Sequence, residues 1–555
     1  MATLNFKGKT FVQNHHLAVK YHQLIPKKEK SLTDKVSLND NLIIHGDNLK
    51  ALKALLPTYA GKVKCIYIDP PYNTGNEKWA YNDNVNSPMM QEWLGKVVDR
   101  EDLTRHDKWL CMMMPRLKLL RELLSEDGVI FVSIDNNEIH RLRLLMDDVF
   151  YNNFISQFAW KGKSGAEDDD YFRTQNEHIL CYAKDKNKFI AGEQIKFDEK
   201  FPKYDPIKKR NYKTQLARKW GSNSRRVDRP NLYYPITAPT GESVYPLLPA
   251  GEDGCWRWDK RKMEKEIAEG NIEFERDGEE WIVYQKIWET DKGEEPRTKK
   301  FNTWLDDVGS TSTGTDEIKE IFNEKVFEHP KPTTLIKRLI EMSGAEENDI
   351  ILDSFAGSGT TAHAVLSMNK SGGNKKFILI QLPEEIEKDR PAYKLGFREV
   401  IDITNERVRR VIKGVPNARD EKLRNGLGGS FSYFELGDPI EMESILEGDK
   451  LPSYLELARY VFYTATGEEF DPAKVDENKN FIGESKEYEV YLFYKTDIEY
   501  LKSTALTLER AKKLGQYKGK KRLVFAPSKY LDNDYLLQYH IDYCQLPFEI
   551  YKLRD

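Results

Sequence analysis

The sequence predicts an α/β fold, in which helices cover a mainly parallel sheet, interrupted by one long inserted segment. Short runs of β-branched and apolar residues alternate with helical patterns of about 10–15 residues, which is typical of βαβ units. This alternation stops near residue 158 and returns after residue 324. Two of the expected strands end in unusual turns, one rich in proline and one rich in glycine. One α/β domain is therefore expected to be split by the insert.

The first half of this domain is expected to contribute three strands and two helices. The strands are the apolar runs at residues 41–45, 63–68 and 129–134. One helix covers residues 49–56, where six apolar residues share a helical face, and the other covers residues 109–124. The residues before 36 are polar and basic, and order is expected to begin after them.

The second half shows the same alternation after the insert. Helices are expected at residues 333–340, from residue 362 onward and at residues 401–412, with strands at 349–352 and 376–382. The chain changes character again after residue 425. Strands are expected there at 487–494 and 521–526 and a helix at 504–514, which predicts a separate small α/β module.

These changes divide the chain into five expected regions. They are an N-terminal polar segment (1–35), the first half of the α/β domain (36–157), the insert (158–324), the second half of the domain (325–424) and the C-terminal module (425–555).

Composition excludes several classes of protein. With 39% hydrophobic and 32% charged residues among 555, the chain is neither collagen-like nor disordered. No apolar run approaches the roughly 18 residues of a membrane span, and the N-terminus lacks the apolar core of a signal peptide. The five cysteines lie far apart and never at CxxC spacing. This argues against disulfides and a structural zinc site, predicts no bound metal, and favours a reducing cytoplasm.

A glycine-rich turn follows the strand expected at residues 349–352. The sequence there is Ile-Leu-Asp-Ser-Phe-Ala-Gly-Ser-Gly-Thr-Thr, with glycines at 357 and 359. Glycines let the backbone approach a ligand closely, and the helix that follows offers free N–H donors. Nucleotide-like cofactors bind at such places, although a GxG turn also serves as a plain tight connection. It is neither a P-loop nor a full GxGxxG motif.

A proline-rich turn, Asp69-Pro70-Pro71-Tyr72, follows the strand expected at residues 63–68. Two prolines fix an extended turn that has carbonyls but few N–H donors. The Asp69 carboxylate and the Pro70 carbonyl can both accept hydrogen bonds, which suits an exocyclic amino group. The Tyr72 ring can stack on the base that carries this amine.

Together, the two turns resemble those of amino-methylating DNA methyltransferases of the beta motif order, in which the catalytic Asp-Pro-Pro-Tyr precedes the cofactor loop. The likeness is greatest to modification (Mod) subunits of type III restriction–modification systems. The strings IHGDNLKALKALL, VKCIYIDPPYNTG, PRLKLLRELLSEDGVIFVSIDNNE and ILDSFAGSGTTAHAV carry it. It implies a Rossmann-like, S-adenosylmethionine-dependent methyltransferase domain with circularly permuted motif order and an inserted target-recognition domain.

The resemblance also implies roles for individual residues. Asp69, Pro70, Pro71 and Tyr72 match the catalytic motif, and Asp353, Phe355, Gly357 and Gly359 match the cofactor loop. Lys331, in His-Pro-Lys-Pro, lies in a segment that helps to hold the methionine end of the cofactor, or simply begins a helix. Asp47 stands where an acid contacts the cofactor adenine, and it also suits the N-cap of the next helix.

Two positions depart from the family pattern. The strand whose last residue usually is an acid that binds the cofactor ribose ends here in Gln381, and acids follow only at Glu384 and Glu385. Gln381 is therefore the candidate at this position. A His-Glu pair of the family reads Asn-Glu here, at Glu177, with His178 displaced by one position, and this site is expected to be structural.

The implied chemistry is transfer of a methyl group to adenine N6. Hydrogen bonds from N6 to Asp69 and the Pro70 carbonyl concentrate charge on a nitrogen that is otherwise a poor nucleophile. The enzyme then mainly needs to align the amine with the methyl group and to exclude water. The target atom is buried in the duplex, so the base must be flipped out. A C5-cytosine reaction would need a cysteine after proline, which Cys544 does not provide.

DNA contact is expected in the insert. The net charge is only −4, but residues 203–229 contain ten Lys or Arg against two Asp or Glu, interleaved with aromatic residues. Positive charge neutralises phosphates, and arginine can read base edges. The candidate DNA-binding residues are Lys208, Lys209, Arg210, Arg225 and Arg226. A solvated basic face is the plainer alternative.

Three other functions remain open from the sequence. The same turns would serve N4-cytosine methylation, although the Asp of the catalytic turn favours adenine. A DNA-binding regulator with an inactive domain is another, and a one-chain restriction enzyme a third, although no P-loop or nuclease motif is present. Besides double-stranded DNA, the expected partners are a second copy of the chain and a restriction (helicase–nuclease) subunit.

Overall fold

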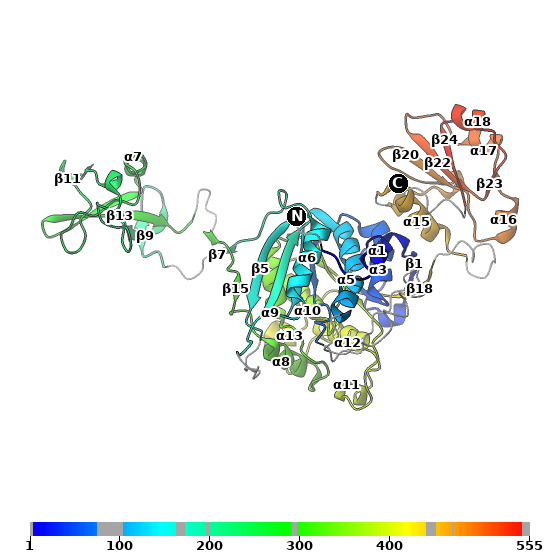
Figure 1. Cartoon of the computed structure of the whole chain (residues 1–555), viewed down its shortest axis with the longest axis horizontal. Coiled ribbons are helices and arrows are strands. Elements are labelled where there is room, and N and C mark those ends of the chain that lie inside the picture. Colours follow the sequence, from blue (N-terminus) through cyan, green and yellow to red (C-terminus); the bar gives the residue numbers. More distant parts are fainter. Residues whose placement is uncertain are drawn as a thin grey trace. The chain divides into compact units, whose positions relative to one another are not determined.

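The computed structural model describes residues 4–74, 104–162, 172–195, 200–290, 297–439, 451–468 and 470–546 (Figure 1). The chain forms two compact units. One unit joins Met1–Gly192 with Asn302–Asp555, and the other is Glu193–Phe301.

A ten-stranded sheet is the centre of the larger unit. Its order is β1 (His22–Pro26), β18 (Ser432–Pro439), β2 (Leu42–His45), β17 (Lys376–Gln381), β16 (Ile350–Asp353), β3 (Val63–Ile68), β4 (Leu124–Ile134), β6 (Glu177–Ala183), β5 (Phe154–Trp160) and β15 (Trp304–Leu305). The six strands from β18 to β4 pair in parallel, whereas β1 and β6 pair antiparallel with their neighbours. The central strands are runs of Ile, Val and Leu because both faces of a parallel sheet are covered.

Two groups of helices cover the sheet. In the first, α3 (Asn48–Tyr59), α5 (Thr104–Leu123) and α6 (Ile139–Phe150) pack side by side. In the second, α8 (Thr311–Phe322), α9 (Thr333–Met342), α10 (Thr360–Asn369) and α12 (Val400–Lys413) do so. Every residue of β3 is buried, so both faces of the sheet are covered at its centre. The shorter helices are α1 (Lys9–Val12), α2 (His15–Ala18), α11 (Pro391–Lys394) and α13 (Glu421–Arg424).

The α/β fold with a mainly parallel sheet is confirmed. Each of the five strands expected in the two halves of the domain coincides with an observed strand, namely β2, β3, β4, β16 and β17. The structure differs at the N-terminus, where the polar residues before 36 include β1, an edge strand of the main sheet. Its aliphatic residues are only Leu24 and Ile25, too few for the sequence pattern to indicate a strand.

The smaller unit, 193–301, is narrower than the insert expected at 158–324. Its sheet has the order β12 (Ile272–Asp277), β13 (Glu280–Trp288), β9 (Arg210–Leu216) and β8 (Lys203–Asp205), with α7 (Lys260–Ala268) and a core around Trp256. The residues on either side of this unit supply β5, β6, β15 and α8 to the larger unit. Two of their aromatic residues, Trp160 and Tyr182, belong to the core of the larger unit, since both are fully buried there. The two-residue strands of the smaller unit are β7 (Gln194–Ile195), β10 (Ile236–Thr237), β11 (Ser243–Val244) and β14 (Thr298–Lys299).

The C-terminal module has a four-stranded sheet of order β19 (Phe481–Glu484), β20 (Tyr488–Leu492), β22 (Lys521–Ala526) and β24 (Ile541–Gln545). Its other elements are α15 (Tyr454–Thr466), α16 (Ile498–Ser503), β21 (Ala505–Leu506), α17 (Leu508–Lys513), β23 (Ser528–Lys529) and α18 (Asn533–Gln538). The expected start at residue 425 is too early, because β18 pairs with β2 in the main sheet. Among the described residues, no helix has the length and apolar character that crossing a membrane requires.

Candidate active site

The proline turn and the glycine loop lie side by side. They follow β3 and β16, which are neighbours in the sheet and run parallel, with Leu352 paired to Ile66. The carboxyl ends of parallel strands meet at one edge of a sheet, where such folds bind their ligands. Two motifs almost 290 positions apart in the sequence therefore share one edge.

The proline turn is fixed by hydrogen bonds at both of its ends. The Trp109 indole N–H donates to the carbonyl of Pro71 at 2.7 Å. The Tyr72 hydroxyl lies 2.9 Å from Asp69 Oδ1 and 2.9 Å from Glu177 Oε2. Burial and these two carboxylates hold the pKa of Tyr72 well above its usual value, so the hydroxyl keeps its proton.

Lys331 completes this group, which we call the Asp69 cluster (Asp69, Tyr72, Glu177 and Lys331). Its ammonium donates to Asp69 Oδ2 at 2.7 Å and to the Tyr72 hydroxyl at 3.0 Å, and lies 3.5 Å from Glu177 Oε2. Burial alone would lower the pKa of Lys331, but Asp69 and Glu177 raise it above its usual value. The lysine is therefore charged.

Sequence reasoning did not bring these residues together. Lys331 was expected at the methionine end of the cofactor and Glu177 in a structural place, but their charged groups both lie at the proline turn. Glu177 reaches it because β6 runs antiparallel to β4, so its first residue stands at the carboxyl end of that strand. No local pattern signals this contact, because Lys331 and Asp69 are 262 positions apart.

Hydrogen bonds to the side chains of Asp353 and Gln381 fix the conformation of the glycine loop. Asp353 is buried and accepts hydrogen bonds from the Phe355 backbone N–H at 3.0 Å and the Thr361 hydroxyl at 2.6 Å. Burial raises the pKa of Asp353 to about 7. The Gly357 N–H donates to Gln381 Oε1 at 2.7 Å. Asp353 and Gln381, expected to touch the cofactor, thus both shape the loop.

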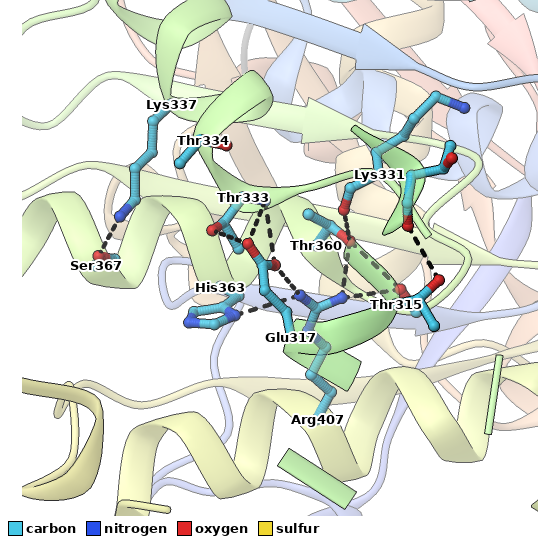
Figure 2. Close-up of polar contacts among 12 residues, drawn as sticks. Thr315, Glu317, Lys331, Thr333, Thr334, Lys337, Thr360, His363, Ser367 and Arg407 are labelled. Carbon is cyan, nitrogen blue, oxygen red and sulfur yellow. Dashed lines mark hydrogen bonds and ion pairs between the residues drawn. The ribbon is translucent and has the colours of Figure 1, made fainter. Parts of the chain in front are cut away.

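A buried polar network lies behind this loop, as Figure 2 shows. The fully buried Arg407 guanidinium donates to Thr360 Oγ1 at 2.7 Å and to Ser358 Oγ at 2.9 Å, and lies 3.3 Å from Glu317 Oε2. Glu317 in turn accepts from the backbone N–H and the hydroxyl of Thr333. Burial lowers the pKa of Arg407 to about 10, which leaves it charged at neutral pH. The network ties α8, α9 and α12 to the start of α10, the helix that follows the loop.

Asp47 is the N-cap of α3, because its carboxylate accepts from the Lys50 N–H at 3.1 Å. It also lies 3.6 Å from the buried Arg116. The neighbouring Asn48 side chain donates to the carbonyl of Ser354 at 3.0 Å, so this helix start touches the glycine loop. The capping role is observed, and contact with a cofactor adenine stays a prediction.

The residues of the loop fit S-adenosylmethionine. Gly357 and Gly359 have φ of 52° and 80°, a backbone conformation in which a side chain is strained. A Cβ at Gly357 would lie 3.2 Å from the Phe327 ring, so a side chain there would also be crowded. The Ser354 hydroxyl is buried and has no hydrogen-bond partner among the described residues. A ligand with carboxylate, ammonium and hydroxyl groups suits such a hydroxyl.

The candidate DNA-binding residues form two groups in the smaller unit. Lys208 and Arg210 lie over the Trp288 ring, at 4.8 and 4.6 Å from its centre. Arg225 and Arg226 stand on an exposed loop, where they pair with Glu252 at 3.4 Å and Asp253 at 2.9 Å. The fifth candidate, Lys209, is exposed beside the first group. DNA contact by these residues stays a prediction.

Comparison with known proteins gives one family. A family model described as DNA methylase matches residues 63–390, a range that contains both loops. The chain is 34% identical over 476 residues to the type III restriction-modification enzyme EcoPI Mod subunit of Escherichia phage P1, covering 80% of this chain and 73% of that protein. It is 33% identical over 412 residues to the type II methyltransferase M.KpnI of Klebsiella pneumoniae, covering 71% and 93%.

Among solved structures, the PvuII DNA methyltransferase (cytosine-N4-specific) aligns over 66% of this chain and 93% of its own, with a TM-score of 0.32 and 12% identity.

Proposed function

The chain belongs to the DNA methylase family, and from this membership we propose that it methylates adenine N6 at a specific site in duplex DNA. The observation that carries the proposal is the Asp69 carboxylate at the end of β3, beside the glycine loop at the end of β16. One turn offers acceptors for an amine, and the other offers open backbone for a cofactor.

S-adenosylmethionine, the cofactor, supplies a methyl group on a sulfonium that is already a good leaving group. We assign its binding to Asp47, Ser354, Phe355, Gly357 and Gly359. The protein's own contribution is then to hold the amine in line, remove water and keep acceptors ready for its N–H groups.

The amine is met by Asp69 and the Pro70 carbonyl. A carboxylate oxygen has more than one lone pair, so Asp69 can accept from Tyr72 and Lys331 and still accept from an incoming N–H. Hydrogen bonds to these acceptors draw charge onto the amine nitrogen. The Tyr72 ring is placed for stacking, and the base must leave the duplex to reach it.

Nucleoside analysis tests the proposal directly. Incubation with labelled S-adenosylmethionine and unmethylated DNA should give N6-methyladenine without cutting the DNA. N4-methylcytosine would select the cytosine alternative, absence of product in a folded, cofactor-binding protein would select a regulator, and cut DNA would select a one-chain restriction enzyme.

Site recognition is assigned to the smaller unit. Neutralising Lys208, Lys209 and Arg210, and separately Arg225 and Arg226, should weaken DNA binding and lower the slope of log affinity against log salt by about 1 for each phosphate that is no longer neutralised. The control is Lys265→Ala on α7, an exposed lysine of the same unit with no place in either group. An unchanged slope in both sets would make the basic stretch a solvated face.

We further propose type III membership, action in the cytoplasm, a homodimer and a restriction subunit as partner. Light scattering with cognate DNA tests the dimer, and one chain of 64.7 kDa per duplex would exclude it. Removal of residues 451–555 tests the C-terminal module, because a cut at that point spares β18 of the main sheet. If the shortened chain still binds a purified restriction subunit, the module is not the docking site.

A further inference from the structure

The members of the Asp69 cluster differ in exposure. The Asp69 side chain is 25% exposed, whereas those of Lys331 and Glu177 are 7% and 8% exposed. Asp69 is therefore the open member, and the ammonium and the second carboxylate lie behind it. A substrate amine can reach Asp69 without displacing the other two.

The charges of the cluster leave one negative charge in excess. Two carboxylates and one ammonium share the Tyr72 hydroxyl, whose single proton can be donated to Asp69 or Glu177 but not to both. The three N–H groups of Lys331 supply the remaining donors. Lys331 lies 2.7 Å from Asp69 Oδ2 and 3.5 Å from Glu177 Oε2, so it offsets one of the two negative charges and one remains in the cluster.

Lys331 is held from both ends. Its backbone carbonyl accepts a hydrogen bond from the Thr360 hydroxyl at 3.2 Å, and Arg407 donates to the same hydroxyl. Its side chain points away from that network, as Figure 2 shows, and its ammonium lies 5.7 Å from the centre of the Trp160 ring. Glu177 is paired with Trp160 in the ladder of β5 and β6. Lys331 is therefore anchored to the start of α10, and Glu177 is anchored in the ladder of β5 and β6.

We propose that Lys331 and Glu177 act together as positioning residues for Asp69: Lys331 orients the carboxylate through a direct hydrogen bond, and Glu177 offsets the charge of the lysine so that the Asp69 cluster keeps one negative charge toward the amine. This inference rests on the proposed function. It gives Lys331 a role toward the base and not toward the cofactor, and it gives Glu177 a role in the reaction.

Removing Lys331 and removing the charge of Glu177 should change the net charge of the Asp69 cluster in opposite directions. Without Lys331, two carboxylates share one hydroxyl in a partly buried site, and like charges this close favour protonation of one of them. Without the charge of Glu177, Lys331 neutralises Asp69, which becomes a weaker acceptor. Loss of both charges restores one net negative charge at Asp69. Among the described residues, the ionisable groups that interact with Asp69 include Tyr67, Tyr72, Lys331 and Asp353, and Glu177 shares Tyr72 and Lys331 with it.

The experiment compares Lys331→Met, Glu177→Gln and the double variant in the full-length protein. Lys331→Met should lower kcat/KM at neutral pH by about 100-fold, the scale of removing one transition-state interaction. The acid limb of its pH profile should move upward by about one pH unit or more. Glu177→Gln should move this limb downward and lower the plateau. The double variant should recover about tenfold over Lys331→Met.

Two controls separate this role from others. Lys337→Met on α9 removes a lysine that donates to Ser367 instead of Asp69, and it should leave the acid limb in place. Affinity for S-adenosylmethionine, measured by calorimetry, should be unchanged in Lys331→Met. Lys331→Arg keeps the charge and should retain the wild-type acid limb.

Several results would overturn the inference. If Lys331→Met loses cofactor affinity while its acid limb does not move, the lysine acts on the cofactor and not on Asp69. If the losses of kcat/KM in the two single variants multiply in the double variant, Lys331 and Glu177 are not coupled through their charges. Thermal unfolding provides a readout without activity, since the double variant should unfold at a higher temperature than Lys331→Met. A wild-type protein without methylated product would refute the proposed function, whereas this difference in unfolding would still test the charge coupling.

Discussion

The proline turn after β3 and the glycine loop after β16 stand on adjacent strands, but they are built in opposite ways. The first presents a side chain, Asp69, whose carboxylate is partly open and is supported from behind by Lys331 and Glu177. In the second, the Asp353 side chain accepts hydrogen bonds from the Phe355 N–H and the Thr361 hydroxyl, and Gln381, at the end of β17, accepts one from the Gly357 N–H.

This difference indicates a division of labour. A carboxylate that must accept hydrogen bonds from a reacting amine has to remain accessible, and it needs charged neighbours to set its protonation state. A loop that must expose backbone needs every nearby side chain directed elsewhere, and it needs a rigid support such as Arg407. The first region should therefore be sensitive to the removal of functional groups, and the second to added atoms and to the removal of its support.

The largest effect is expected at the open carboxylate. Asp69→Ala removes the acceptor for the amine, so kcat should fall by about 1000-fold or more, while affinity for S-adenosylmethionine changes little. Single-turnover methylation and calorimetry measure the two quantities. Tyr72→Phe, which keeps the ring and loses only the hydroxyl, should lose much less. Near-normal turnover of Asp69→Ala would show that the proline turn does not present a group to the reacting amine.

Removing Arg407, which supports the glycine loop, should lower the free energy of unfolding. Arg407→Met leaves Glu317 buried without its cation, and breaking such a pair costs about 3–5 kcal/mol of unfolding free energy. Denaturant titration measures the loss. The matched double variant Arg407→Met with Glu317→Gln removes both charges and should recover part of it. Equal stability of the single and double variants would mean that the ion pair does not support the loop.

Added atoms should harm the glycine loop selectively. Gly357→Val places a β-branched side chain at φ 52°, 3.2 Å from Phe327. The strain is at least about 1–2 kcal/mol, so affinity for the cofactor should fall by about tenfold or more. Gly61→Val is the control, since it has φ 70° but nothing within 4 Å of its Cβ, and it should leave cofactor affinity intact. Unchanged cofactor affinity in folded Gly357→Val would contradict the assignment of the loop.

The smallest effect on stability concerns the buried carboxyl group of Asp353. Because burial raises the pKa of Asp353 to about 7, well above the roughly 3.9 of an unfolded Asp, the folded protein binds a proton that the unfolded chain does not. The stability from this group is therefore full below about pH 4 and is lost as pH rises through about 7. Asp353→Asn should flatten the stability profile between about pH 5 and 7 by up to ~2 kcal/mol. An unaltered slope would show that Asp353 is ionised in the fold.

Local patterns in the sequence were sufficient for much of the fold. The parallel strands at the centre of the sheet are short, mostly apolar runs that contain Ile, Val and Leu. The glycines of the second turn have positive φ, and the prolines of the first turn fix its backbone. Such signals lie within a few consecutive residues. The amino-acid sequence alone therefore determined the order of the two turns along the chain and their likeness to a methylase.

Only the tertiary structure placed Lys331 on Asp69, Glu177 beside Lys331, and Arg407 and Glu317 behind the glycine loop. The same is true of the strands β1 and β18 at one side of the sheet, whose role depends on the strands that they pair with. These contacts join residues tens to hundreds of positions apart, and each side chain has an ordinary solvated alternative when its own segment is considered alone. Their energies arise from burial and from paired charges, which exist only after the sheet has brought the segments together.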